Sequence, residues 1–79
     1  MKRIEFIYNQ YSNDINKDME ESWYKVFDNW EEAFKCWETY CHPLSDLSKE
    51  TIKDGGYHCQ TSNFYDRIVT YTIKEIEVH

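Results

Sequence analysis

In residues 4 to 12, near the start of the chain, the large apolar residues Ile4, Phe6 and Tyr8 alternate with Glu5, Ile7 and Asn9. β-Branched and aromatic residues at a period of two are typical of a strand, because successive side chains point to opposite faces of a sheet. The sequence therefore predicts a first strand here. Residues 12 to 18 are rich in Asn and Asp, whose side chains favour turns, and predict a loop.

The segment from 19 to 41 fits two patterns. Six residues recur at spacings of 4-3-4-3-4, which suits one long helix with an aromatic stripe: Trp23, Phe27, Trp30, Phe34, Trp37 and Cys41. The competing pattern divides the segment at Asp28, because residues 23 to 27 have high strand propensity. Asp28 and Glu31 also have the spacing of a capping box, with Asp28 capping the backbone N–H of Glu31. We favour a strand over 21–27 followed by a helix over 29–41.

The expected helix over 29–41 has one apolar face that we assign to the core: Trp30, Ala33, Phe34, Trp37 and Cys41. Phe6 and Tyr71 are the strand residues expected beside it. Aromatic residues make up 18% of the chain, which is more than so small a core can bury. We therefore expect five tyrosines to be partly exposed: Tyr11, Tyr24, Tyr40, Tyr57 and Tyr65.

After the main helix, Pro43 disfavours helical geometry at His42 and ends the helix. A short second helix over 45–53 fits Ser45 or Asp46 as its N-cap. The glycine pair at 55–56 predicts the end of that helix and a turn into a strand.

Two more strands are expected, over 57–61 and 65–78, with a turn at Ser62-Asn63 between them. Ile73 and Ile76 have opposite parity on the last strand, so a bulge near Lys74-Glu75 is expected to restore the phase. Together the elements predict an α+β fold: a small antiparallel sheet of about four strands, a main helix (29–41) packed on it and a short second helix (45–53).

Composition narrows the class of protein. The chain has 79 residues, 41% of them hydrophobic, which suits a single domain over 1–79. Nine basic residues against 15 acidic ones give a formal net charge of −6. Direct binding to nucleic acid or to an anionic membrane is not expected, because both need a basic surface. Neither a signal peptide nor an apolar run of roughly 20 residues is recognised, so we expect a cytoplasmic protein.

The three cysteines are an odd number, which does not suit a disulfide framework, and we expect free thiols and no metal or other cofactor. Two alternatives stay open. Cys41, His42, His58 and Cys59 could supply the four ligands of a zinc site if the fold brought the two pairs together. A disulfide between Cys41 and Cys59 is the other alternative.

No constellation of residues predicts an enzyme. The adjacent glycines do not form a phosphate-binding loop. His58 and Cys59 are neighbours on an expected strand, so their side chains point to opposite faces and cannot act as a nucleophile pair. His42 with Cys59 is the pair that geometry leaves open, and we do not expect catalysis from it.

Acidic residues concentrate between positions 14 and 38, with tyrosines nearby. Carboxylates can occupy the places where phosphates would meet Arg and Lys, and exposed aromatic residues anchor protein interfaces. We therefore expect a partner-binding surface made of Asp18, Glu20, Glu21, Tyr24, Asp28, Glu31, Glu32, Glu38 and Tyr40. The neutral alternative is a solvated face that keeps the protein soluble.

Size, acidity, tyrosine content and the lack of a catalytic motif together give a chain that resembles the small acidic inhibitor proteins of bacteriophages, such as anti-CRISPR, anti-defence and host-takeover proteins. This is a resemblance of class without a shared motif. It implies a non-enzymatic inhibitor in a bacterial host cell, whose protein partner is a nucleic-acid-handling effector such as a CRISPR effector, polymerase or repair enzyme. The alternatives are a nucleotide-signal sponge, with Lys2, Arg3 and Arg67 as its phosphate cradle, and a small zinc-bound structural protein.

Overall fold

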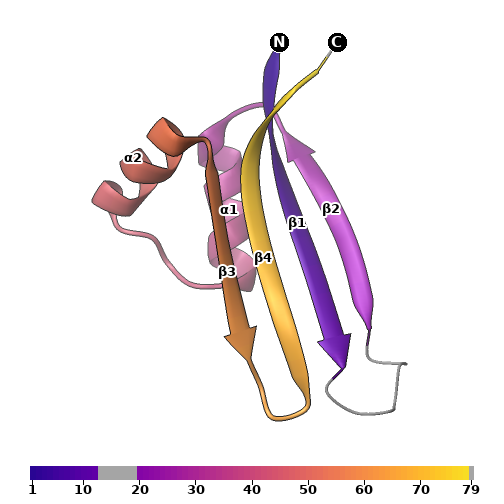
Figure 1. Ribbon diagram of the computed structural model, residues 1–79. Helices are drawn as coiled ribbons and strands as arrows, with labels where there is room; N and C mark the ends of the chain where they lie inside the picture. The colour runs from indigo at the N-terminus through magenta and orange to yellow at the C-terminus, as the bar shows by residue number, and fades with distance from the viewer. Residues whose placement is uncertain (13–19, 79) are drawn as a thin grey trace.

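The computed structural model describes residues 1–12 and 20–78. It contains four strands and two helices: β1 (Lys2–Ser12), β2 (Glu21–Phe27), α1 (Trp30–Tyr40), α2 (Asp46–Gly55), β3 (Tyr57–Asn63) and β4 (Arg67–Glu77). The strands form one sheet in the order β2-β1-β4-β3, and every neighbouring pair is antiparallel. The expected α+β fold is thus confirmed. The ends of the chain lie side by side at one end of the sheet (Figure 1).

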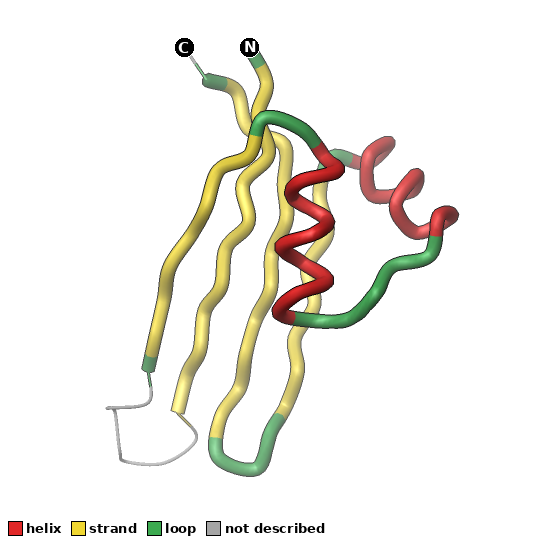
Figure 2. The backbone as a smooth tube through the Cα atoms, turned by 180° about the vertical axis from the view of Figure 1, so that it is seen from behind, coloured by secondary structure: helices red, strands yellow, loops and turns green. Residues whose placement is uncertain are grey.

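Both helices lie on the same face of the sheet, which leaves the other face uncovered (Figure 2). The strand pairing fixes which residues belong to which face. Phe6 of β1 lies opposite Ile73 of β4, and their side chains point toward the helices. Ile7 and Thr72, one position along, point to the open face.

The division of residues 19–41 into a strand and a helix is confirmed, but the predicted cap is wrong by one residue. Asn29 is the N-cap of α1, and its side chain accepts a hydrogen bond of 2.9 Å from the backbone N–H of Glu32. Asp28 instead forms an ion pair of 3.3 Å with Arg3. An amide at Asn29 caps as well as a carboxylate does, and the acidic residue is left free to pair across the sheet.

The second helix begins as predicted, because Ser45 caps it by accepting from the backbone N–H of Ser48 at 3.2 Å. It ends two residues later than expected, at Gly55, where Gly56 adopts a left-handed backbone with φ of 71°. Glycine adopts that conformation without the steric cost of a Cβ. The backbone N–H of Gly56 then donates to the carbonyl of Ile52, and β3 follows directly.

Two predictions about the last hairpin are wrong. Ser62 and Asn63 belong to β3, and the turn falls on residues 64–66. The β1–β4 register also runs without a bulge from Lys2 opposite Glu77 to Ser12 opposite Arg67. No bulge is needed, because Ile76 lies on the open face and does not belong to the core.

The core lies between the two helices and the covered face of the sheet. It comprises Ile4, Phe6, Ala33, Phe34, Trp37, Ile52, Val69, Tyr71 and Ile73. Trp37 is fully buried, and its ring meets that of Phe6 edge-on at 6.1 Å. Trp30 and Cys41, which we expected to be buried, are half-buried because they lie at the two ends of the helix.

Candidate partner-binding surface

The acidic residues that the sequence assigns to one partner-binding surface do not all come together. Glu31 and Glu32 are exposed in the first turn of α1. Glu20 and Glu21 lie at the start of β2, whereas α1 follows the end of that strand. The two pairs of glutamates are therefore separated by the length of β2. Asp18 lies outside the described residues. The predicted set therefore includes two separate pairs of glutamates along the β2–α1 edge of the molecule.

Glu38 has a structural role that the sequence did not reveal. Its carboxylate forms an ion pair of 3.3 Å with Lys49 of α2 and accepts a hydrogen bond of 3.4 Å from the backbone N–H of Leu44. It thus links α1 to the connecting segment and to the second helix. We remove Glu38 from the partner-binding surface for this reason.

The two tyrosines of the predicted surface lie on opposite faces. Tyr40 ends α1, and its ring packs against Trp23 at 5.0 Å and against Phe6 at 6.1 Å. Tyr24 pairs with Ile7 and points to the open face, where it is 65% exposed. A single partner surface cannot include both rings unless the partner wraps around the edge strand β2.

Ion pairing divides the carboxylates into two groups. In the sheet, Glu5 pairs with Lys74 at 3.7 Å and Glu75 pairs with Lys2 at 3.1 Å. A second group forms no ion pair anywhere in residues 1–12 and 20–78: Glu20, Glu21, Glu31, Glu32, Asp46, Glu50 and Asp54. All seven are exposed.

The last three of these carboxylates were not part of the surface predicted from the sequence. Asp46, Glu50 and Asp54 are four residues apart, so they lie along one side of α2. The spacing is visible in the printed sequence, but it carries meaning only once a helix is assigned there. We call these carboxylates, together with Glu31 and Glu32 of α1, the acidic helix surface; α1 and α2 lie on the same side of the sheet (Figure 2).

The open face of the sheet is the second candidate surface. It carries the exposed rings of Tyr24 and Tyr57 and the half-buried side chains of Ile7, Ile68 and Ile76. Tyr11, Tyr40 and Tyr65 are also exposed, so all five tyrosines behave as the composition predicts. Exposed aromatic residues beside aliphatic ones are typical of protein interfaces.

The cysteines and histidines do not form the alternative metal site. Cys59 pairs with Thr72 on the open face, whereas His58 points to the covered face beside Trp37. No group of three or more metal-ligand side chains occurs among the residues described. Cys41 is a free thiol near the core, so a disulfide to Cys59 is also excluded. Burial raises the pKa of the Cys36 and Cys41 thiols, which disfavours the nucleophilic thiolate.

Comparison with known proteins gives no relative: no family model, no curated protein and no solved structure matches the chain significantly. Neither α1 nor α2, the helices of the described residues, has the length and apolar character that crossing a bilayer requires.

Proposed function

We propose that the protein is a non-enzymatic inhibitor that binds a nucleic-acid-handling effector of a bacterial host cell through the acidic helix surface. One observation supports this function above the others: the carboxylates of α1 and α2 point to solvent without ion pairs among the described residues, except Glu38. On the two central strands, by contrast, Glu5 and Glu75 are paired with lysines.

The chemistry of the partner follows from this charge. A groove that binds nucleic acid is lined by Arg and Lys, which form their strongest hydrogen bonds with anionic oxygens. Carboxylates without ion pairs can meet such cations with no internal pair to break first. The net charge of −6 would also accelerate the encounter by electrostatic steering.

Charge reversal on α2 tests the proposal. The double variant E50K/D54K changes the net charge from −6 to −2, because each substitution adds two charges. The control D66K/E77K makes the same change in net charge away from the helices, at two ion-paired residues at the ends of β4: Asp66, which is partly exposed, and Glu77, which is exposed. Tagged proteins are used to capture partners from a bacterial lysate, and the captured proteins are eluted with duplex DNA or RNA.

We expect the unmodified protein and the control to retain a partner that nucleic acid displaces, and E50K/D54K to lose it. Capture should also weaken as salt rises, because exposed charges are screened over about 10 Å at 0.1 M. A second reversal, E31K/E32K, should act in the same direction. It needs a check of folding, since carboxylates in a first turn stabilise a helix by about 0.3–1 kcal/mol each. Equal capture by the reversed and control proteins would contradict the proposal.

The nucleotide-sponge alternative receives no support from the positions of its three basic residues. Lys2 pairs with Glu75 and Arg3 pairs with Asp28, both at one end of the sheet. Arg67 lies opposite Ser12, ten residues further along β1 than Lys2, which corresponds to roughly 33 Å of strand. The three side chains cannot close around one phosphate group.

A further inference from the structure

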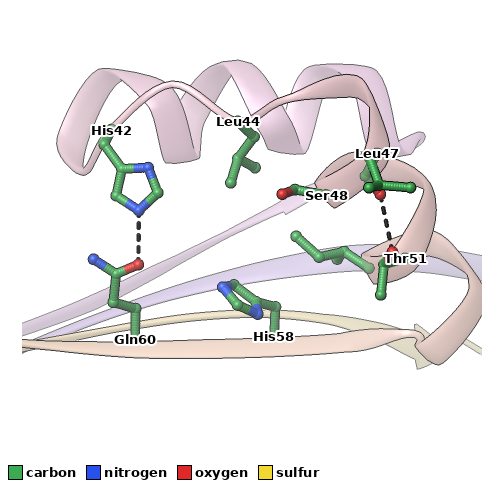
Figure 3. A pocket seen from close by; sticks show the side chains of 8 residues that line it. His42, Leu44, Leu47, Ser48, Thr51, His58 and Gln60 are labelled. Carbon is green, nitrogen blue, oxygen red and sulfur yellow. Dashed lines mark hydrogen bonds between the residues drawn. The ribbon is translucent and has the colours of Figure 1, made fainter.

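A cavity of about 430 Å³ lies between α2 and β3, on the covered side of the sheet (Figure 3). Its apolar wall comes from Leu44, Leu47 and Ile52. Facing it are the polar side chains of His42, His58 and Gln60. The volume lies within the range of roughly 300–1,000 Å³ that is usual for small-molecule sites.

Ile52 is the one buried residue of α2, so the rest of this helix lies at the surface beside the cavity. Ile52 is 4% exposed and packs into the core, whereas Leu47, one and a half turns earlier, is 77% exposed at the rim. A large aliphatic side chain left in solvent at the mouth of a cavity offers apolar area that a ligand can cover.

His42 lies at the polar wall, with both ring nitrogens close to oxygen acceptors. Its Nδ1 lies 2.9 Å from the carbonyl oxygen of Pro43, and its Nε2 lies 2.7 Å from Oε1 of Gln60. Both contacts are made to acceptor oxygens, so the imidazolium, in which both ring nitrogens donate, fits them better than either neutral tautomer. The Pro43 carbonyl and then the Gln60 side chain raise the pKa of His42.

Two further groups are available to donate to an anion. The ring of His58 packs against Trp37 at 5.1 Å and makes no hydrogen bond within the described ranges. The Ser48 hydroxyl accepts from the hydroxyl of Ser45 at 3.0 Å, which leaves its own proton to donate into the cavity that Ser48 lines. Ser48 also lies in the first turn of α2, where the helix dipole favours negative charge.

The acidic residues of α2 do not line this cavity. The helix contributes residues 47, 48, 51 and 52 to the lining, and Asp46, Glu50 and Asp54 are not part of it. None of the residues that line the cavity is acidic. Although the chain has 15 acidic residues, a bound anion would therefore not be repelled by a carboxylate in the cavity lining.

We propose that this cavity binds a small carboxylic acid with a short apolar chain. The carboxylate lies at the polar wall, beside the His42 ring and within reach of the His58 ring and the Ser48 hydroxyl. The chain lies along Leu44, Leu47 and Ile52. This site is independent of the acidic helix surface and of any protein partner.

The experiment is a titration of the isotope-labelled protein with hexanoate, followed by backbone amide NMR. Hexylamine and hexanol, which carry the same chain with a positive head and a neutral one, are titrated in parallel. We expect hexanoate to give saturable shifts confined to residues 42–52 and 58–60, hexanol to bind more weakly, and hexylamine to bind weakest of the three.

Three variants separate the contributions. His42→Gln removes the charge and should weaken hexanoate binding about tenfold or more, which is the usual size for a charged partner. Leu47→Ser shortens the apolar wall at an exposed position and should also weaken it. Lys53→Gln, which removes a positive charge from α2 outside the cavity lining, is the matched control and should bind like the unmodified protein.

The proposal would be overturned if hexylamine bound as tightly as hexanoate. It would also be overturned if His42→Gln bound hexanoate as tightly as Lys53→Gln does. So would the absence of saturable shifts with hexanoate. The variant E50K/D54K should keep hexanoate binding, because its substitutions lie outside the cavity lining. Failure of the inhibitor proposal and failure of this one are therefore distinguishable.

Discussion

The two faces of the sheet are made by the same four strands, yet they differ in what covers them. On the covered face, Phe6 and Ile73 are fully buried beneath the rings of α1. On the open face, Tyr24 and Tyr57 are more than half exposed although they belong to the same sheet. Apolar residues occur on both faces, so hydrophobicity along a strand does not by itself decide which face becomes the core.

The comparison also separates stability from interaction. The covered face excludes water over a continuous set of aromatic and aliphatic side chains, which is where burial stabilises a small domain. On the open face the aromatic rings are exposed to solvent, and charged side chains form ion pairs such as Glu5–Lys74. Substitutions on the two faces should therefore have very different effects on the free energy of unfolding.

The largest expected effect is that of Trp37→Ala. Replacing a fully buried aromatic residue by Ala costs about 3–5 kcal/mol, which approaches the whole stability of a domain of this size. Trp37→Ala should be largely unfolded, and Tyr24→Ala, on the open face, should change the free energy of unfolding by only about 0.5 kcal/mol. Urea denaturation followed by circular dichroism measures both. Similar midpoints for the two variants would show that the faces do not differ in this way.

An intermediate effect is expected where the chain passes from β2 into the helix that covers the sheet. Asn29→Ala removes the N-cap of α1 and should cost about 0.5–2 kcal/mol. Asp28→Ala removes an exposed ion pair with Arg3 and should cost no more than about 1 kcal/mol. The same denaturation experiment compares them. If Asp28→Ala is the more damaging substitution, the side-chain cap contributes less than the link between the loop and β1.

Much of this fold could be predicted because its local signals agree. The alternation of Ile4, Phe6 and Tyr8, the glycine at 56 and the cap at Ser45 each point to the element that forms. Local signals failed where two neighbouring residues could both serve as the N-cap of α1, as Asp28 and Asn29 can. They also failed at Ser62-Asn63, where pairing with Ile68 and Val69 of β4 overrides turn propensity.

The candidate sites depend on contacts that are distant in sequence, so little of them could be predicted. His42 meets Gln60, and Glu38 meets Lys49, only after the chain has folded back. The sequence grouped His42 and His58 with two cysteines as possible metal ligands. It could not reveal that α2 would leave a cavity beside both histidines while Cys59 lies on the other face.

The smallest effect is expected at the margin of the covered face, where His42 bonds to Gln60. The pKa of His42 is raised above 6.5 in the folded protein, first by the Pro43 carbonyl and then by Gln60. A raised folded pKa means that protonation stabilises the fold. This contribution is complete below pH 6.5 and is lost as the pH rises through the folded pKa.

His42→Gln lacks this proton, so its deficit in stability relative to the unmodified protein should be largest below pH 6.5 and should shrink toward alkaline pH. Because His42 is exposed, the deficit should not exceed about 1 kcal/mol. Urea denaturation of both proteins across a pH series, with Lys53→Gln as the control, measures it. A deficit that stays constant or grows with pH would mean that the Pro43 and Gln60 contacts do not hold the imidazolium. The polar wall of the cavity would then carry no positive charge at His42. It would lack the feature that distinguishes it in charge from the acidic helix surface.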